Sequence, residues 1–115
     1  QVIYEAQQVI SSPQFARLQE AYKAGRPVSV NIGGRLIQYE PDIPMGYSGV
    51  TDFQRNGFAM GRQAFSSAQE MQKTVLHELH RLATSQISGG ASGALVKQET
   101  GAAHQFADRA VGALR

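Results

Sequence analysis

The stretch VSVNIGGRLIQYE, residues 28–40, decides the fold that we expect for this chain. Its first half, up to Ile32, alternates valine or isoleucine with polar residues, a period of two that is typical of a half-buried strand. Its second half, up to Tyr39, is a further apolar run. Gly33 and Gly34 lie between the two runs, and both central positions of a two-residue hairpin turn favour a positive φ. The pattern therefore predicts a β-hairpin, which two prolines soon after it bring to an end.

Helical patterns precede this hairpin. Apolar residues recur at helical spacing within residues 1–25, first up to Ile10 and then again from Phe15 onward. Ser12 and Pro13 lie between the two patterns, where serine can cap a helix and proline fits the first helical turn without losing a hydrogen bond. Gly25 can end the second helix. We therefore expect two short helices before the sheet.

The chain after the hairpin is expected to be mostly helical. Residues 45–56 are polar and contain glycine, so they predict a loop, and Gly57 to Gly61 predicts a further short strand. Two serines at 66 and 67 form overlapping capping boxes with Gln69 and Glu70, so a long helix should begin there and run to about residue 84. Residues 86–96 are rich in glycine and serine and predict a loop, and residues 99–114 predict a last helix.

These elements predict one α+β domain over residues 1–115. Helices in residues 1–25 and 66–115 would flank a small, mainly antiparallel sheet in residues 27–61. The chain has 115 residues and no cysteine, which excludes disulfides, thiolate catalysis and cysteine-bound zinc. Its net charge of +2 permits an anionic partner without requiring one. No stretch approaches the roughly 20 apolar residues of a membrane span.

The long helix carries the candidate catalytic residues. Its core-facing stripe consists of apolar residues at helical spacing: Met71, Val75, Leu79 and Leu82. The opposite side carries a row of polar residues at steps of four and three: Glu70, Thr74, His77, Arg81 and Thr84. Such a row is also typical of the solvated face of any amphipathic helix. The spacing alone leaves a solvated face and an active site as two interpretations.

The row contains the groups that RNA cleavage by the 2′-hydroxyl needs. His77 can take or give a proton near neutral pH, and Glu78 beside it completes the candidate acid–base set. Arg81 can hold the phosphate and offset its developing charge, while Thr84 or Ser85 can donate to a phosphate oxygen.

Residues outside this row are candidates for binding the substrate: Arg35, Tyr39 and Lys73. Tyr39 ends a predicted strand and could line a cleft, although tyrosine at such a position more often packs in the core. Arg35 follows the hairpin turn, and the second interpretation of this residue is a charged side chain in solvent with no binding role.

A metal site is the second interpretation of the long helix. The pentapeptide HELHR, residues 77–81, begins like the H-E-x-x-H zinc helix, but Arg81 occupies the position of the second histidine. His77 and His80 could share a metal only with distortion or with help from Glu99 or His104. A zinc hydrolase is therefore kept as the alternative enzyme, and a binding or pore-forming module as the non-enzymatic alternative.

Four segments are similar to the C-terminal toxin regions of contact-dependent growth inhibition and filamentous-haemagglutinin-type proteins. They are GGRLIQYEP (residues 33–41), GFAMGRQAFSS (57–67), TVLHELHRLATS (74–85) and ETGAAHQFADRA (99–110). The likeness covers most of residues 15 to 112 and is one of pattern.

The resemblance implies a function for the domain. It implies a toxin at the end of a secreted, cell-surface protein, delivered into the cytoplasm of a neighbouring bacterium, and the start at Gln1 fits a segment of a longer chain. It also implies a cognate immunity protein and an RNA target such as tRNA, and it is compatible with activation by a host factor. Many metal-free RNase toxins of this kind have the barnase/EndoU/colicin/RelE fold and use His, Arg and Thr or Ser, so no cofactor is expected.

Overall fold

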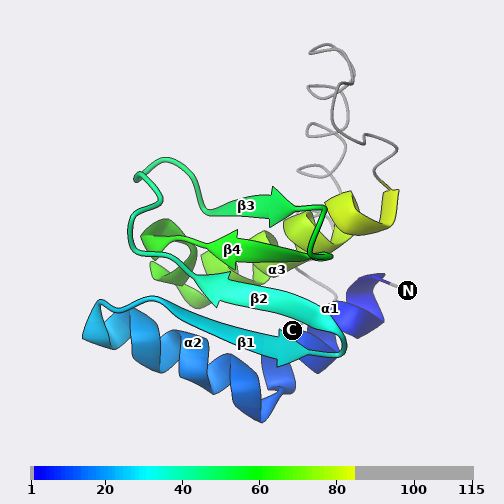
Figure 1. The fold of residues 1–115 in the computed structure, drawn as a ribbon, viewed down its shortest axis with the longest axis horizontal. Helices are drawn as coiled ribbons and strands as arrows, with labels where there is room; N and C mark the ends of the chain where they lie inside the picture. The colour runs from blue at the N-terminus through cyan, green and yellow to red at the C-terminus, as the bar shows by residue number, and fades with distance from the viewer. Residues whose placement is uncertain (1, 85–115) are drawn as a thin grey trace.

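The computed structural model describes residues 2–84, and the expected loop at 86–96 and the expected last helix at 99–114 lie outside them. The elements follow one another in the order α1 (Val2–Ser11), α2 (Pro13–Ala24), β1 (Val28–Ile32), β2 (Arg35–Tyr39), β3 (Gly49–Asp52), β4 (Gly57–Met60), the 3₁₀ helix η1 (Arg62–Phe65) and α3 (Ala68–Thr84). Figure 1 shows this arrangement. The α+β class is confirmed.

The four strands form one sheet in the order β1-β2-β4-β3. β1 pairs with β2 and β3 pairs with β4 in antiparallel fashion, whereas β2 and β4 run parallel. The sheet is therefore mostly antiparallel, as expected. The prediction of a loop over residues 45–56 was wrong, because this segment contains β3, which forms one edge of the sheet.

The local signals that predict the ends of elements are confirmed. Gly33 and Gly34 have φ values of 59° and 85°, and the backbone N–H of Gly34 donates to Asn31 Oδ1 at 3.2 Å. Ser12 caps α2 by accepting from the backbone N–H of Gln14 at 3.3 Å, and Gly25 ends α2 in the left-handed conformation. The hairpin and α2 therefore form where glycine, serine and proline make them favourable.

Ser67 caps α3. Its hydroxyl accepts from the backbone N–H of Glu70 at 3.0 Å, which satisfies one of the free donors of the first turn. α3 then runs to Thr84, as the sequence predicts. Within residues 2–84, no helix combines the length and the apolar character that crossing a bilayer requires.

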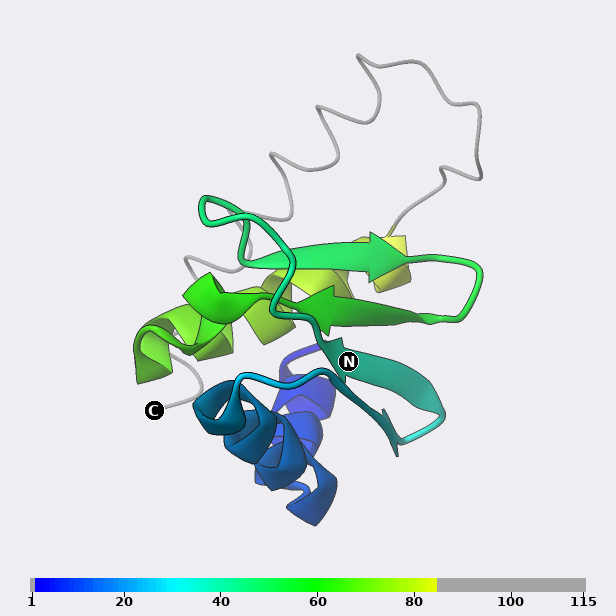
Figure 2. The same ribbon diagram turned by 60° about the vertical axis from the view of Figure 1, so that its left-hand side comes forward.

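The three α-helices lie on one face of the sheet (Figures 1 and 2). The alternating side chains that point toward them form the core with the apolar sides of the helices. The strand residues with buried apolar side chains are Val30, Ile32, Ile37, Tyr39, Phe58 and Met60. The helix-facing positions of β3 are Gly49 and Thr51, which pair with Met60 and Phe58. α3 packs against α1, η1 and β3, so one side of α3 faces this edge of the sheet.

Candidate active site

A cleft of about 500 Å³ lies between α3 and the segment that leads into β3. Its volume is within the range of about 300–1,000 Å³ that is typical of ligand pockets. We call it the α3 cleft. Its lining comes from three parts of the chain: Gly46, Tyr47, Ser48 and Gly49 before or in β3; Gln63 in η1; and Glu70, Lys73, Thr74, His77, Glu78 and Arg81 in α3.

The polar row of α3 lines this cleft over most of its length. Glu70, Thr74, His77 and Arg81 all belong to the lining. A solvated face does not describe the middle of the row, because the exposed fraction is 3% for Thr74 and 9% for His77. β3 accounts for this burial, since it packs against the side of α3 that the sequence left without a neighbour.

Glu78 is the most deeply buried charged side chain of the cleft, with an exposed fraction of 2%. Its Oε1 accepts a hydrogen bond from the hydroxyl of Thr51 in β3. Its Oε2 lies 3.6 Å from His77 Nε2. Burial raises the pKa of Glu78 above its ordinary value of 4.5, while the Thr51 hydroxyl and the nearby charge of Arg81 oppose this shift. We call this arrangement the His77–Glu78 pair.

The close approach of β3 to α3 depends on Gly49. A Cβ atom at this position would lie 3.0 Å from the carbonyl oxygen of Ala59, 3.2 Å from Thr74 Cγ2 and 3.4 Å from Glu78 Oε2. A larger residue would therefore push β3 away from the helix. Glycine at 49 lets Thr51, two residues further along the same face, reach the carboxyl group of Glu78.

Replacing Glu78 by glutamine is expected to stabilise the fold at neutral pH. The unfolded chain releases the proton of Glu78 around its ordinary pKa of 4.5. In the folded protein the pKa is raised, so Glu78 keeps this proton to a higher pH. The wild type therefore loses stability as pH rises from 4.5 through the folded pKa, and Glu78→Gln does not. Urea unfolding between about pH 4 and pH 8 measures the difference in the free energy of unfolding. An advantage of the glutamine variant that stays constant or shrinks with pH would contradict this account.

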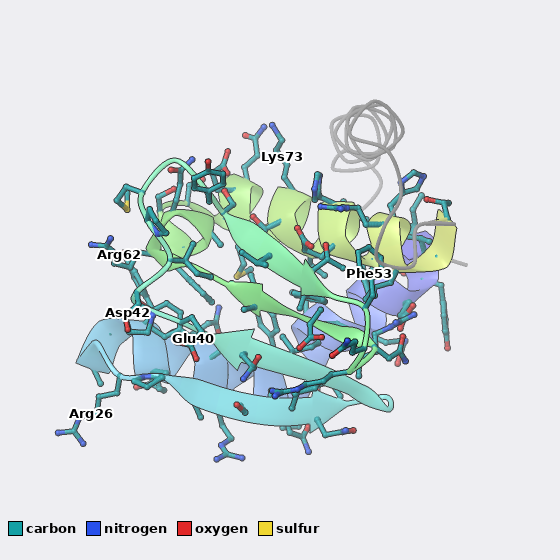
Figure 3. The ribbon with its side chains drawn as sticks, turned by 45° about the horizontal axis from the view of Figure 1, so that its top comes forward. Arg26, Glu40, Asp42, Phe53, Arg62 and Lys73 are labelled. Atoms are coloured by element: carbon teal, nitrogen blue, oxygen red, sulfur yellow. The ribbon has the colours of Figure 1, made fainter. Side chains whose placement is uncertain are left out.

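Two cations lie along the cleft. The guanidinium carbon of Arg81 lies 5.6 Å from the centre of the Phe53 ring, a cation–π contact at the C-terminal end of α3. Lys73 lines the cleft nearer the N-terminal end of the helix. Figure 3 shows Lys73 and Phe53 toward opposite ends of α3. The His77–Glu78 pair therefore lies between two positive groups along the helix.

Three other predicted site residues that the structure describes do not line the α3 cleft: Thr84, Arg35 and Tyr39. Thr84 is exposed and its hydroxyl donates to the carbonyl oxygen of His80 at 2.7 Å, and Ser85 is outside the described residues. Neither Arg35 nor Tyr39 belongs to the lining of the α3 cleft. Arg35 donates to both carboxylate oxygens of Glu5 in α1, through Nε at 2.5 Å and Nη2 at 3.2 Å, so it joins α1 to the sheet.

Tyr39 belongs to the aromatic part of the core. Its ring lies 5.9 Å from that of Tyr22 and 5.5 Å from that of Phe65, both in edge-to-face geometry. Its exposed fraction is 1%, and burial raises the pKa of its hydroxyl. Tyr39 therefore packs in the core, which was the second interpretation of this residue from the sequence.

Over residues 2–84, no three His, Cys, Asp or Glu side chains come together in a group that could hold a metal ion. Glu99 and His104, which the sequence suggested as additional ligands, lie outside these residues.

Sequence reasoning missed the wall of the cleft that faces α3. Tyr47, Ser48, Gly49 and Thr51 all fall in the segment that was expected to be a loop. The β-branched pair Val50-Thr51 is a strand signal, but two residues are too few to stand out against the glycines and polar residues around them. Ser48 donates to Glu70 Oε2 at 3.2 Å, so this wall is tied to α3 at both of its ends.

No protein-family model matches the chain, and neither a curated protein nor a solved structure matches it.

Proposed function

We propose that the α3 cleft is the active site of a ribonuclease that cleaves RNA through the 2′-hydroxyl. The observation that carries this proposal is the His77–Glu78 pair, with 3.6 Å between Nε2 and Oε2, in a cleft that Lys73 and Arg81 also line. Cleavage of this kind needs two groups that exchange protons and a cation for the phosphate, and His77, Glu78 and Arg81 are side chains of these types.

The proton transfers follow from the pair. A base removes the proton of the 2′-hydroxyl, the O2′–P bond forms, the P–O5′ bond breaks, and an acid protonates the leaving 5′-oxygen. Burial raises the pKa of Glu78, which favours the carboxylic acid form of this side chain. His77 then acts as the base and Glu78 as the acid, and the products are a 2′,3′-cyclic phosphate and a 5′-hydroxyl.

Arg81 and Lys73 have the role of binding the phosphate. As the O2′–P bond forms, negative charge builds on the phosphate oxygens, and a guanidinium in a partly buried cleft stabilises it more than water does. The Phe53 ring restricts the side chain of Arg81, so less conformational entropy is lost when Arg81 binds the phosphate.

The setting that we propose is competition between bacteria. The resemblance of residues 33–41, 57–67 and 74–85 to C-terminal toxin regions supports a toxin domain that is delivered to the cytoplasm of a neighbouring cell. There it would cleave tRNA or another RNA, and a cognate immunity protein would protect the producing cell.

Expression of the chain in a sensitive bacterium tests this proposal. We expect growth arrest together with fragmentation of tRNA or rRNA on a gel of total RNA, and cleavage by the purified protein in the presence of a chelator. Growth arrest with intact RNA would support the non-enzymatic alternative. Activity that a chelator removes and zinc restores would support the zinc hydrolase.

A further inference from the structure

We propose that the α3 cleft takes an unpaired stretch of RNA, whose bases stack on two exposed aromatic rings, Tyr47 at one end and Phe53 at the other. This inference rests on the proposed function, because it specifies which form of RNA the site accepts. The two rings lie on either side of β3 in the sequence, one in the segment before the strand and one in the turn after it.

Both side chains are partly exposed to solvent. The exposed fraction is 63% for Tyr47, which lines the cleft, and 38% for Phe53. Tyr47 belongs to the lining of the cleft, and Phe53 lies beside it through its contact with Arg81, which is a lining residue. Nucleobases are flat and stack on aromatic side chains with little regard to sequence.

The contact between Phe53 and Arg81 connects base binding to the phosphate. The guanidinium of Arg81 lies near the ring at 5.6 Å and also lines the cleft. A base stacked on Phe53 would therefore bring its own phosphate group close to a cation. Lys73 lines the same cleft as Tyr47.

The dimensions of the cleft suit a short single strand. Its lining runs along α3 from Glu70 to Arg81, a rise of about 16 Å along the helix axis. A short single strand can follow this length along the open side of the cleft. In a duplex the bases remain paired and stacked on one another, so they cannot be offered to Tyr47 and Phe53.

Binding of a labelled oligonucleotide tests the inference. The probe is a short RNA whose 2′-hydroxyls are replaced by fluorine, which prevents cleavage, and fluorescence anisotropy measures its Kd either alone or annealed to its complement. We expect the single strand to bind at least about tenfold more tightly than the duplex. Tyr47→Ala and Phe53→Ala should each weaken single-strand binding by about five- to 150-fold.

Two control variants separate stacking from general damage. Tyr47→Phe keeps the ring and should bind as the wild type does, whereas Tyr4→Ala removes a similarly exposed tyrosine from α1 and should leave binding unchanged. Unchanged binding by both Tyr47→Ala and Phe53→Ala would overturn the inference.

Cleavage of unmodified RNA by the same proteins distinguishes the two proposals. Cleavage that depends on His77, combined with equal binding of duplex and single strand, would overturn the inference and leave the proposed function standing. Absence of any RNA cleavage would overturn the proposed function, and the inference with it.

Discussion

Replacement of His77 by alanine is expected to lower the rate of RNA cleavage by a factor of about 10² to 10⁴, the usual contribution of one general acid–base group. The variant removes the imidazole whose Nε2 lies 3.6 Å from Glu78 Oε2, so the pair loses the group proposed to take the 2′-hydroxyl proton. Bacteria that express His77→Ala should therefore grow, whereas bacteria that express the wild type should stop growing.

His80→Ala is the matched control for this result. It removes the same side chain from the same helix, at a position that does not belong to the lining of the α3 cleft. We expect it to keep the activity of the wild type. Circular dichroism and urea unfolding of both variants show whether each remains folded. Full killing by a folded His77→Ala protein would be incompatible with the proposed catalytic role.

Replacement of Gly57 by alanine is expected to have the largest effect on stability, at least about 3 kcal/mol in the free energy of unfolding. A Cβ atom at this position would lie 1.8 Å from the carbonyl oxygen and 2.7 Å from the carbonyl carbon of Leu36. Both atoms belong to the backbone of β2, so the strands themselves must move apart. Because β4 lies between β2 and β3, the damage would also reach the α3 cleft.

Gly33→Ala provides the comparison for this variant. Gly33 has a φ of 59° and open space around its position for a Cβ, so alanine there meets backbone strain without a clash. That strain is worth about 1–2 kcal/mol. Urea unfolding should therefore rank the wild type first, Gly33→Ala second and Gly57→Ala last. A Gly57→Ala protein as stable as the wild type would show that β2 and β4 do not pair as described.

The elements that the sequence predicts well are those with local causes. The turn at Gly33 and Gly34, the caps at Ser12 and Ser67, and the helical stop at Gly25 each depend on residues within a few positions of one another. These interactions form in the same way wherever the segment lies in the fold. The row of His77 and Arg81 on one side of α3 follows equally from the helical repeat.

The parts that could not be predicted depend on contacts between distant segments. β3 is four residues long and includes Gly49 and Asp52, which have low strand propensity, so its pairing with β4 is what makes it a strand. Thr51 meets Glu78 across 27 positions of sequence. Without β3, nothing in the sequence indicates that His77 and Glu78 are buried or that a cleft lies beside them.

The same reason explains Arg35 and Tyr39. Arginine and tyrosine near the ends of a strand are compatible with a binding site. Only the residues that they contact in the fold show that Arg35 and Tyr39 have structural roles. Glu5 comes from α1 and Phe65 from η1, and neither is near its partner in the sequence. The alternation of β2 predicts that Tyr39 faces the same side as Ile37, but not that an aromatic cluster occupies that side.

The chemical ends of the cleavage products test the central claim most directly. Mass spectrometry of a defined RNA after incubation with the purified chain and a chelator identifies them. The mechanism predicts a 2′,3′-cyclic phosphate, or the 3′-phosphate formed from it, on one fragment and a 5′-hydroxyl on the other. Fragments with a 5′-phosphate and a 3′-hydroxyl would contradict it, because attack by the 2′-hydroxyl cannot produce them.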